Sequence, residues 1–402
     1  MSELTVRGRC FVAAGAAAVL CGIWVGEQDF VRIGLLTLLV PTLSWLLLRR
    51  TPRSVWVRRE LSSLRVEAGE TARVEVVVGN SGRRTGLLLL EDELDPALGE
   101  RQRFAVGPLA PGEVTPQQYR IRARVRGRYP VGPMHVRVAD PFAMVALDQV
   151  LTSTADILVT PRTEPLAPIG LTGRWAGAGD NRTRDFLGAG SPDVAIREYH
   201  LGDDLRRIHW PTSARVDELM VRREEQEWQS RCTLLVDNRQ CAHAGAGEAS
   251  SLEAAVSATA SILLHLVARD FEVRLVTATG ESSSHGWHQG ARGAALSTHL
   301  ERLALLQPSP STQLATGWVD DSQHGGMILA VLGRLTPRDL EVLAGFAAAG
   351  DSAYAVMLDV DAWESGRPTP APATASLRRH GWKASTLTPE GPLAAAWQEL
   401  GR

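Results

Sequence analysis

The residues whose types and spacing could support chemistry are concentrated between positions 197 and 215. Acids, bases and aromatic side chains alternate in this stretch around a single glycine. Two histidines and two aspartates lie close together in it: His200, Asp203, Asp204 and His209. Imidazole and carboxylate groups at such spacing could bind a metal ion or exchange a proton with a substrate. One hypothesis is therefore a hydrolase or another metal-dependent enzyme.

A structural explanation of the same stretch competes with the catalytic one. Arginine and carboxylate side chains form directional, bidentate ion pairs, so a segment this rich in both can stabilise itself or bind a partner. Asp203 is also placed to cap a helix that begins near Leu205. The sequence contains no Gly-x-Ser-x-Gly elbow, no His-Glu-x-x-His helix and no phosphate-binding loop. We favour the structural or partner-binding explanation, with no catalytic residue, no bound metal and no cofactor.

The elements that must position this stretch begin with two apolar segments, residues 11–26 and 33–48. Each is close to the roughly 20 residues that a spanning helix needs. We expect a transmembrane helical hairpin over residues 1–54, with helices at about 10–27 and 32–49 and a polar turn over 27–32. A cleaved signal peptide is the alternative. It is disfavoured because no small-x-small cleavage site closes the first segment and a second apolar segment follows at once.

The residues that flank the apolar segments predict the orientation of the hairpin. Arg7 and Arg9 precede the first segment, and five arginines follow the second: Arg49, Arg50, Arg53, Arg58 and Arg59. The connecting turn carries two acids and one arginine. The positive-inside rule then places both termini and the soluble domains in the cytoplasm. We expect a multi-pass protein of the cell membrane that contacts the lipid bilayer through this hairpin.

Residues 55–160 alternate apolar and polar side chains with the period of a β-strand, as in 73–78 and 119–126. Turn signals interrupt the pattern at 79–82, 110–112 and 129–133. Several short strands with this punctuation predict a β-sandwich-like domain. One strand carries a row of arginines: Arg120, Arg122, Arg124 and Arg126. The row could bind anionic lipid or an acidic partner, but we favour a solvated strand face.

Residues 161–228 form the signature segment and a linker, and residues 229–402 alternate between strand and helix patterns. We expect strands at 233–237, 271–277, 327–332 and 353–360, and helices at 248–269, 294–306, 336–348 and 392–400. Residues 367–373 resemble a linker or surface arm, because proline alternates there with small residues. This order predicts an α/β, doubly wound and mainly parallel sheet.

Composition limits the classes of function. Hydrophobic residues make up 44% and charged residues 22% of the 402 residues, which suits folded domains with a core. A net charge of −2 provides no overall basic field to recruit nucleic acid. The four cysteines have no metal-ligand spacing and fit a reducing compartment.

The stretch at 197–215 closely resembles the hallmark of the bacterial "domain of unknown function 58" family, R-E-Y-x-x-G-D-x-x-R-x-I-x-W-x-x-S-A-R. The matching residues are Arg197, Glu198, Tyr199, Gly202, Asp203, Arg206, Ile208, Trp210, Ser213, Ala214 and Arg215. Gly127, Tyr129, Gly132-Pro133 and Asp140-Pro141-Phe142 fit the same pattern in the preceding domain.

The resemblance implies a membrane hairpin, a β-rich domain and a von Willebrand factor A-like domain. It also suggests a partner, because such proteins are often encoded beside MoxR-type AAA+ ATPases. No activity is established for the family. The positions of His200 and His209 vary among similar sequences, which weighs against catalysis. The matching Arg, Glu, Tyr, Asp, Trp and Ser residues suit a structural network or a partner surface.

An A-type domain usually holds magnesium at the end of its first strand through an Asp-x-Ser-x-Ser motif. Asp237 matches the aspartate of that motif, while Arg239 and Cys241 stand at the two serine positions. A guanidinium repels a cation, and a thiol is a poor magnesium ligand. We therefore expect a degenerate metal site at Asp237 and Arg239, in which Arg239 pairs with Asp237 where the ion would be.

These observations favour a membrane-anchored, non-enzymatic scaffold or adaptor that docks a MoxR-type AAA+ ATPase or another protein during complex assembly. Two other hypotheses compete with it. The first is the hydrolase or metal-dependent enzyme that would use His200, Asp203, Asp204 and His209. The second is a metal-dependent adhesion module, which Arg239 and the expected cytoplasmic location both oppose.

Overall fold

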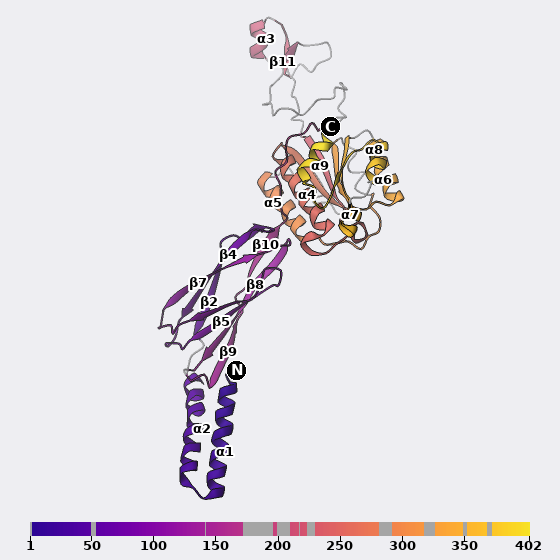
Figure 1. The fold of residues 1–402 in the computed structure, drawn as a ribbon. Helices are drawn as coiled ribbons and strands as arrows, with labels where there is room; N and C mark the ends of the chain where they lie inside the picture. Colours follow the sequence, from indigo (N-terminus) through magenta and orange to yellow (C-terminus); the bar gives the residue numbers. More distant parts are fainter. Residues whose placement is uncertain are drawn as a thin grey trace. The chain divides into compact units, whose positions relative to one another are not determined.

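The protein is described here by a computed structural model that divides into two compact units, Met1–Pro161 and Arg162–Arg402 (Figure 1). Each unit has its own hydrophobic core, as expected for separate domains. The structure describes residues 2–49, 54–140, 142–171, 196–198, 210–216, 218–222, 230–280, 292–316, 326–348, 352–367 and 372–402.

Two apolar helices, α1 (Val6–Val25) and α2 (Gln28–Arg49), lie near the start of the first unit. Both are long and apolar enough to cross a membrane, as the sequence predicted. The predicted polar turn was too long, because α2 already begins at Gln28. Asp29 lies in the first turn of α2, where the helix dipole favours a carboxylate. Its carboxylate also pairs with Arg32 at 2.9 Å.

The two helices pack through small residues. The buried residues of α1 are Gly8, Gly15 and Gly22, which recur every seven residues along one side of the helix. A Cβ atom added at Gly15 would lie 2.8 Å from Leu38 Cγ and 3.0 Å from the backbone oxygen of Gly34. Glycine at positions 15 and 22 therefore lets the two helices approach, as in many membrane helix pairs, whereas a Cβ atom at Gly8 would meet the Met144 backbone.

The rest of the first unit is β-rich, as predicted, and forms two sheets around one core. The larger sheet has seven strands: five follow the order β1-β9-β8-β10-β3, β5 also pairs with β8, and β6 pairs with β5. The smaller sheet has the order β2-β4-β7. Alternate residues Val74, Val76 and Val78 are fully buried, as the period-two pattern requires. The strands are β1 (Ser2–Leu4), β2 (Val55–Leu61), β3 (Arg65–Glu67), β4 (Thr71–Asn80), β5 (Leu88–Leu94), β6 (Gln102–Val106), β7 (Val114–Arg122), β8 (Gly127–Ala139), β9 (Val145–Leu151) and β10 (Ala155–Thr160).

One turn prediction was wrong. Residues 129–133 lie inside β8 and do not end a strand. Before Gly132, β8 pairs with β10, and after it β8 pairs with β9. Gly132 has a φ of 98°, which glycine adopts without a steric penalty. The Gly-Pro signal therefore marks a change of strand partner within one continuous strand.

A buried polar cluster joins the two sheets of the β-rich domain. Arg59 of β2 pairs with Asp92 of β5, with 2.6 Å between Nη2 and Oδ1. The hydroxyl of Tyr119, on β7, donates to the other carboxylate oxygen of Asp92 at 2.7 Å. Burial, followed by the charge of Asp92, raises the pKa of Tyr119, so its proton stays available for this bond. Loss of one partner would leave a buried charge uncompensated.

The second unit contains a five-stranded sheet in the order β14-β13-β15-β16-β17, and all of its pairings are parallel. Its strands are β13 (Ser230–Val236), β14 (Phe271–Thr277), β15 (Met327–Leu332), β16 (Ser352–Leu358) and β17 (Lys383–Leu387). This result confirms the predicted α/β sheet of parallel strands. The chain order reverses between β13 and β15, which is the switch point of a doubly wound sheet.

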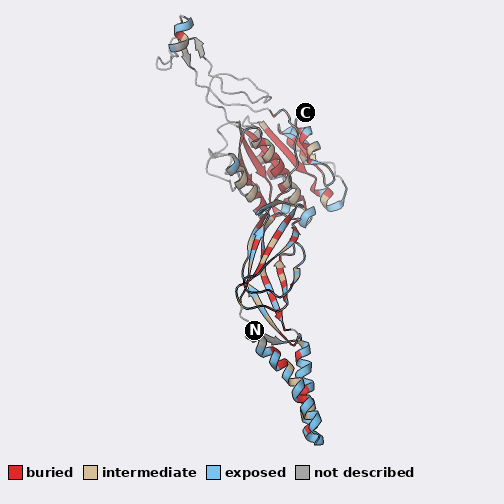
Figure 2. Cartoon of the chain, turned by 90° about the vertical axis from the view of Figure 1, so that its left-hand side faces the viewer, coloured by how far each residue is buried: buried red, intermediate tan, exposed pale blue. Residues whose placement is uncertain are grey.

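Helices cover both faces of this sheet. Residues of α4 (Ser251–Val267), α5 (Arg292–Leu305) and α9 (Leu393–Leu400) share one core with the sheet. Residues of α6 (Pro337–Ala348) and α8 (Pro372–Arg379) share another. Figure 2 shows buried residues filling the strands between the helices. Because both faces are covered, all six residues of β15 are buried.

Three elements near the carboxyl terminus were not predicted: α7 (Val360–Ser365), α8 and β17. The predicted arm over 367–373 overlaps the start of α8, which begins at Pro372. Proline suits the first helical position because its missing N–H has no partner there. Residues 368–371 lie outside the described part of the chain.

Candidate functional site

Asp237 lies immediately after β13, at the switch point of the parallel sheet. Its backbone N–H donates to Val331 O of the neighbouring strand β15 at 2.9 Å. In open α/β sheets, ligands bind in the crevice outside the strand ends at this point. The Asp237 and Arg239 side chains are fully buried there. The switch-point crevice is therefore occupied by the protein's own side chains.

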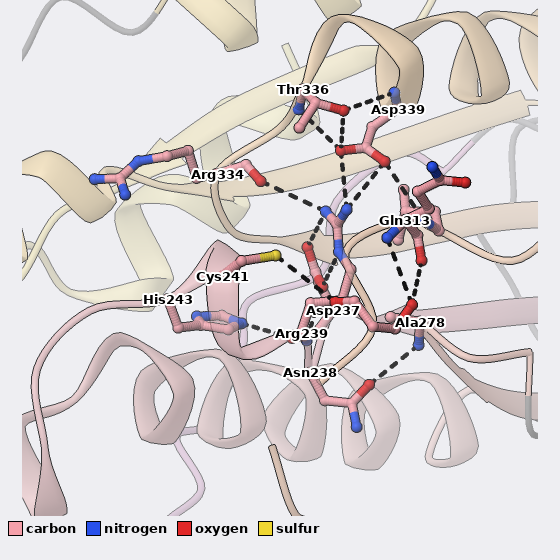
Figure 3. Close-up of polar contacts among 12 residues, drawn as sticks. Asp237, Asn238, Arg239, Cys241, His243, Ala278, Gln313, Arg334, Thr336 and Asp339 are labelled. Atoms are coloured by element: carbon pink, nitrogen blue, oxygen red, sulfur yellow. Dashed lines mark hydrogen bonds and ion pairs between the residues drawn. The ribbon is translucent and has the colours of Figure 1, made fainter. Parts of the chain in front are cut away.

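Arg239 and Asp237 form the expected ion pair through two parallel hydrogen bonds (Figure 3). Nε of Arg239 donates to Oδ1 at 2.9 Å, and Nη2 donates to Oδ2 at 2.8 Å. The backbone N–H of Arg239 donates to the same Oδ1 at 3.1 Å. This bidentate geometry is the strongest that a guanidinium and a carboxylate form.

A second carboxylate, Asp339, completes the cluster from the first turn of α6. Nη1 of Arg239 donates to both of its oxygens, at 3.0 and 2.9 Å. The N–H and the hydroxyl of Thr336 each donate to Asp339 Oδ2 at 2.8 Å. The Asp339 N–H returns a 3.3 Å bond to the Thr336 hydroxyl. This reciprocal capping arrangement fixes Asp339 at the start of α6.

The ionisation of the cluster follows from these contacts. Burial lowers the pKa of Arg239, but hydrogen bonds to Asp237 and Asp339 outweigh it and hold the pKa above its ordinary value. Burial raises the pKa of Asp339, but hydrogen bonds from Thr336 and Arg239 leave it below its ordinary value. We conclude that the guanidinium and the Asp339 carboxylate are both charged at neutral pH.

Two neighbouring polar side chains, His243 and Asn238, form hydrogen bonds that connect the cluster to nearby segments. The His243 ring lies 2.7 Å from Asp237 O through Nε2 and 3.0 Å from Ser251 Oγ through Nδ1. Burial lowers the pKa of His243, so the ring is neutral. Asn238 Nδ2 donates to Gln307 O at 2.9 Å. A serine and a histidine do meet here, but Ser251 is fully buried and the ring bonds a backbone oxygen, so the pair suits a structural role.

The cluster contains its own positive charge, the Arg239 guanidinium. Arg239 lies between the two carboxylates, and the nearby Cys241 is exposed. Within the part of the chain that the structure describes, no group of three or more His, Cys, Asp or Glu side chains could hold a metal ion. The arrangement fits a fixed ionic link better than a site for ion exchange.

A pocket of about 510 Å³ borders the cluster on the side of Asp339. Its other lining residues are Thr279, Ser311, Gln313, Leu314, Ala315, Thr316, Arg338 and Val342. Asp339 also lines this pocket, but its carboxylate is already bonded to Arg239 and Thr336. The pocket therefore offers mostly neutral polar groups and the Arg338 side chain.

The signature segment is described in part. Arg197 and Glu198 lie on β11 (Ile196–Glu198), which pairs antiparallel with β12 (Met220–Arg222). Ser213 lies on α3 (Trp210–Val216), and its buried hydroxyl accepts the Met220 N–H at 2.8 Å. Ser213 thus links the short helix to the strand pair.

Trp210 and Arg215 of α3 are exposed, the former with 66% of its surface accessible. Five signature positions lie outside the described residues: Tyr199, Gly202, Asp203, Arg206 and Ile208. The residues of the catalytic hypothesis, His200, Asp203, Asp204 and His209, lie there too.

Sequence reasoning missed Asp339, which lies 100 positions after Arg239. A local signal existed, because Thr336-Pro337-x-Asp339 is a helix-start pattern with a capping threonine, a proline at the first position and an acid at the third. That pattern predicts the helix but not the arginine to which the acid is bonded.

Residues 195–359 match the family model described as "Protein of unknown function DUF58". The match supports the family indicated by the signature, over 165 of the 402 residues (359 − 195 + 1). No curated protein matches the chain.

Similarities to solved structures are weak. The CARDB domain of the PF1109 protein from Pyrococcus furiosus is 19% identical, over 27% of this chain and 96% of that one, with a TM-score of 0.20. The sporulation control protein Spo0M from Bacillus subtilis is 15% identical, over 27% and 50%, with a TM-score of 0.17. A GH20 exo-β-N-acetylglucosaminidase from Vibrio harveyi is 12% identical, over 83% and 75%, with a TM-score of 0.21. These scores give no ground for transferring a fold or an activity.

Proposed function

Because residues 195–359 match the DUF58 family, we propose that this chain is a membrane-anchored, non-enzymatic scaffold. The helices α1 and α2 anchor it, and the second unit docks a protein partner in complex assembly. A MoxR-type AAA+ ATPase is the suggested partner. The ATP chemistry belongs to that partner, since the sequence has no phosphate-binding loop.

One observation carries the proposal: the crevice where an α/β sheet usually binds its ligand is filled by Arg239. The guanidinium is fully buried and bonded to both Asp237 and Asp339. A ligand could reach the Asp237 carboxylate only by displacing the guanidinium, which would leave two carboxylates buried without their partner. Such a site favours a role in holding the domain together over a role in turnover.

The von Willebrand factor A-like assignment is part of the proposal. A parallel sheet with helices on both faces and an aspartate at the end of β13 support it. The Asp-x-Ser-x-Ser motif of such domains is replaced by Asp237, Arg239 and Cys241. We propose that the domain binds its partner without a bridging metal ion.

Exposed apolar residues near the signature support a docking role. Trp210 and Val216 of α3 are 66% and 53% exposed, and Leu219 is 44% exposed. Tryptophan is among the residues most often found at the energetic centre of protein interfaces. We propose that this α3 surface (Trp210, Val216 and Leu219) contacts the partner.

The test uses the full-length chain in native membranes or vesicles and a purified MoxR-type ATPase from the same genome. Crosslinking capture is compared for the native chain, Trp210→Ala, Asp203→Ala and the control Leu305→Ala. Leu305 is a 40% exposed leucine on α5, outside the signature. We expect capture to be lost for Trp210→Ala and retained for Leu305→Ala. Equal capture by all chains would place the docking surface elsewhere, and no capture by the native chain would exclude this partner.

The proposed cytoplasmic location of the second unit can be tested by labelling a native cysteine. Cys241 is the exposed cysteine of the second unit, while Cys232 is buried. A membrane-impermeant maleimide applied to intact cells should leave Cys241 unlabelled, and labelling should appear after the cells are opened. Cys241→Ser is the control for signal from other positions. Labelling in intact cells would reverse the proposed orientation.

A further inference from the structure

The end of the β-rich domain next to the hairpin carries exposed groups that the proposed partner surface does not use. Strand registers bring several elements to this end (Figure 1). Leu4 of β1, just before α1, pairs with Val145 at the start of β9. Leu88 at the start of β5 pairs with Val138 near the end of β8. We call this region, where the 81–87 and 140–144 loops lie, the hairpin-side end.

The loop at 140–144 is built to present Phe142. Buried Asp140 accepts the Phe142 N–H at 3.0 Å and the Val145 N–H at 2.7 Å. The hydroxyl of Thr5, the capping residue of α1, donates to Ala143 O at 2.6 Å. Phe142 is nevertheless 57% exposed. The loop thus holds a large apolar side chain in solvent directly beside the start of α1.

A second loop presents two arginines in a similar way. Buried Asn80 donates through Nδ2 to Arg83 O at 2.8 Å and to Leu109 O at 3.0 Å. Its Oδ1 accepts the Ser54 hydroxyl at 2.7 Å, at the point where the described chain resumes after α2. Arg83 and Arg84 are both exposed. Asn80 therefore fixes this arginine loop to the segment that follows the hairpin.

The hairpin-side end carries several exposed basic side chains. Four exposed arginines belong to it: Arg7, Arg9, Arg83 and Arg84. Among the described residues, none of the four has a carboxylate partner within ion-pair distance. The nearby carboxylate of Glu113 instead accepts the Ala110 N–H. Leu87, the last residue before β5, adds an apolar side chain that is 47% exposed.

We propose that the hairpin-side end docks on the headgroup layer of an anionic lipid bilayer, with Phe142 and Leu87 entering the interface and the four arginines binding lipid phosphates. The proposal rests on the proposed anchoring by α1 and α2. A helix of 20 residues is about 30 Å long, the thickness of the hydrocarbon core, so the start of α1 reaches the headgroups. Apolar and basic side chains together are the composition of interfacial contacts.

A lipid surface explains this end better than a protein does. Both loops are tied by hydrogen bonds to residues near the helices that are long and apolar enough to span a bilayer, through Thr5 just before α1 and Ser54 after α2. The anionic lipids of a cytoplasmic leaflet match the excess of arginine. Docking would fix the orientation of the first unit on the membrane.

The test places a fluorescent probe at position 142 of the full-length chain. The exposed cysteines are removed as Cys10→Ser, Cys21→Ser and Cys241→Ser, and an environment-sensitive nitrobenzoxadiazole is attached to Phe142→Cys. The reference probe is at Glu100→Cys, in the exposed turn after β5 at the opposite end of the domain. Both chains are reconstituted in vesicles of phosphatidylcholine, with or without phosphatidylglycerol, some carrying a headgroup-level nitroxide quencher. We expect blue-shifted, quenched emission at position 142 in the anionic vesicles and neither effect at position 100.

The charge requirement is tested with two matched double variants. Arg83→Gln with Arg84→Gln should lower the ratio of docked to undocked domain by about fivefold per arginine. Arg101→Gln with Arg103→Gln removes the same charge near β6, at the other end, and should leave the ratio unchanged. High salt should act like the first double variant, because it screens the lipid charge.

The outcomes separate this proposal from the anchoring on which it rests. Failure of the chain to float with either vesicle overturns the anchor itself. Flotation with an unquenched probe at position 142 overturns only the docking of the hairpin-side end. Equal quenching without phosphatidylglycerol, unaffected by the Arg83/Arg84 variant, overturns the role of anionic lipid. A blue shift in detergent that grows with protein concentration assigns the surface to a second copy of the chain and overturns the lipid proposal.

Discussion

The Arg239 guanidinium and the Asp339 carboxylate, 100 positions apart in the chain, lie 2.9 Å apart with almost no access to solvent. This ion pair joins the loop after β13 to the start of α6. With Asp237 it makes one buried unit of two carboxylates and one guanidinium.

Arg239→Ala should destabilise the second unit by about 3–5 kcal/mol, because both carboxylates lose their buried partner. Denaturant unfolding followed by the fluorescence of buried Trp382 and Trp397 measures the change. The control is Arg334→Ala, since Arg334 also contacts two acids, Asp361 and Glu364, but at the surface. The loss of the Arg334 side chain should lower the free energy of unfolding by less than about 1 kcal/mol. A similar cost for both variants would contradict the burial argument.

Stability should fall as the pH drops below the ordinary histidine pKa of 6.5. Burial, the largest influence, lowers the pKa of folded His243, so the unfolded chain binds the proton first. The stability contributed by neutral His243 is complete above pH 6.5 and is lost as pH falls toward the folded pKa, with a slope of at most about 1.4 kcal/mol per pH unit.

The substitution His243→Gln should reduce the pH dependence of the free energy of unfolding, measured by denaturant titrations at several pH values. Part of it should remain, because burial also lowers the pKa of His265. His380→Gln serves as the control, since His380 is exposed on the same unit. An undiminished slope in His243→Gln would exclude His243 as its source.

Magnesium should leave the melting temperature of the native chain unchanged, with or without a chelator, because Arg239 already pairs with both Asp237 and Asp339. In Arg239→Ser, the oxygens of Asp237 and Asp339 become available to a hard cation. Millimolar magnesium should then raise the melting temperature, by the linkage between binding and folding. Thermal unfolding of both chains in magnesium and in chelator tests this, and a magnesium-dependent shift in the native chain would contradict the proposed replacement.

Gly15→Ile should separate α1 from α2, because the new side chain would meet Leu38 and the Gly34 backbone at 2.8 and 3.0 Å. The expected result is a lower melting temperature in detergent and a smaller amount of chain in the membrane fraction. Ala14→Ile, at an exposed neighbouring position, is the matched control. If both variants behave like the native chain, the glycine contact is not needed for the hairpin.

Sequence patterns located the elements whose burial is uniform. The predicted bounds of β14 and β15 agree with the structure, because these strands are short apolar runs between clear breaks. Strand β17 was missed because Lys383, Ser385 and Thr386 interrupt its apolar pattern, although Ser385 is fully buried. Its strand conformation depends on pairing with β16 and not on local preference.

The sequence predicted only part of the candidate site, the pair of Asp237 and Arg239. Asp237 and Arg239 are two residues apart at a strand end, so their contact could be expected from local spacing alone. The third member, Asp339, arrives through the packing of α6 beside the sheet, which no local pattern encodes. Likewise, the period-two pattern around Tyr119 predicted a buried ring but not its hydrogen bond to Asp92 on another strand.

The guanidinium between Asp237 and Asp339 is covalently part of the chain, so it cannot dissociate or be chelated. The loop after β13 and the start of α6 therefore stay joined for as long as the domain is folded. Changes in magnesium concentration are therefore not expected to open this junction. In the proposed scaffold, control over partner binding would come from the partner's own state or from other surfaces of the chain.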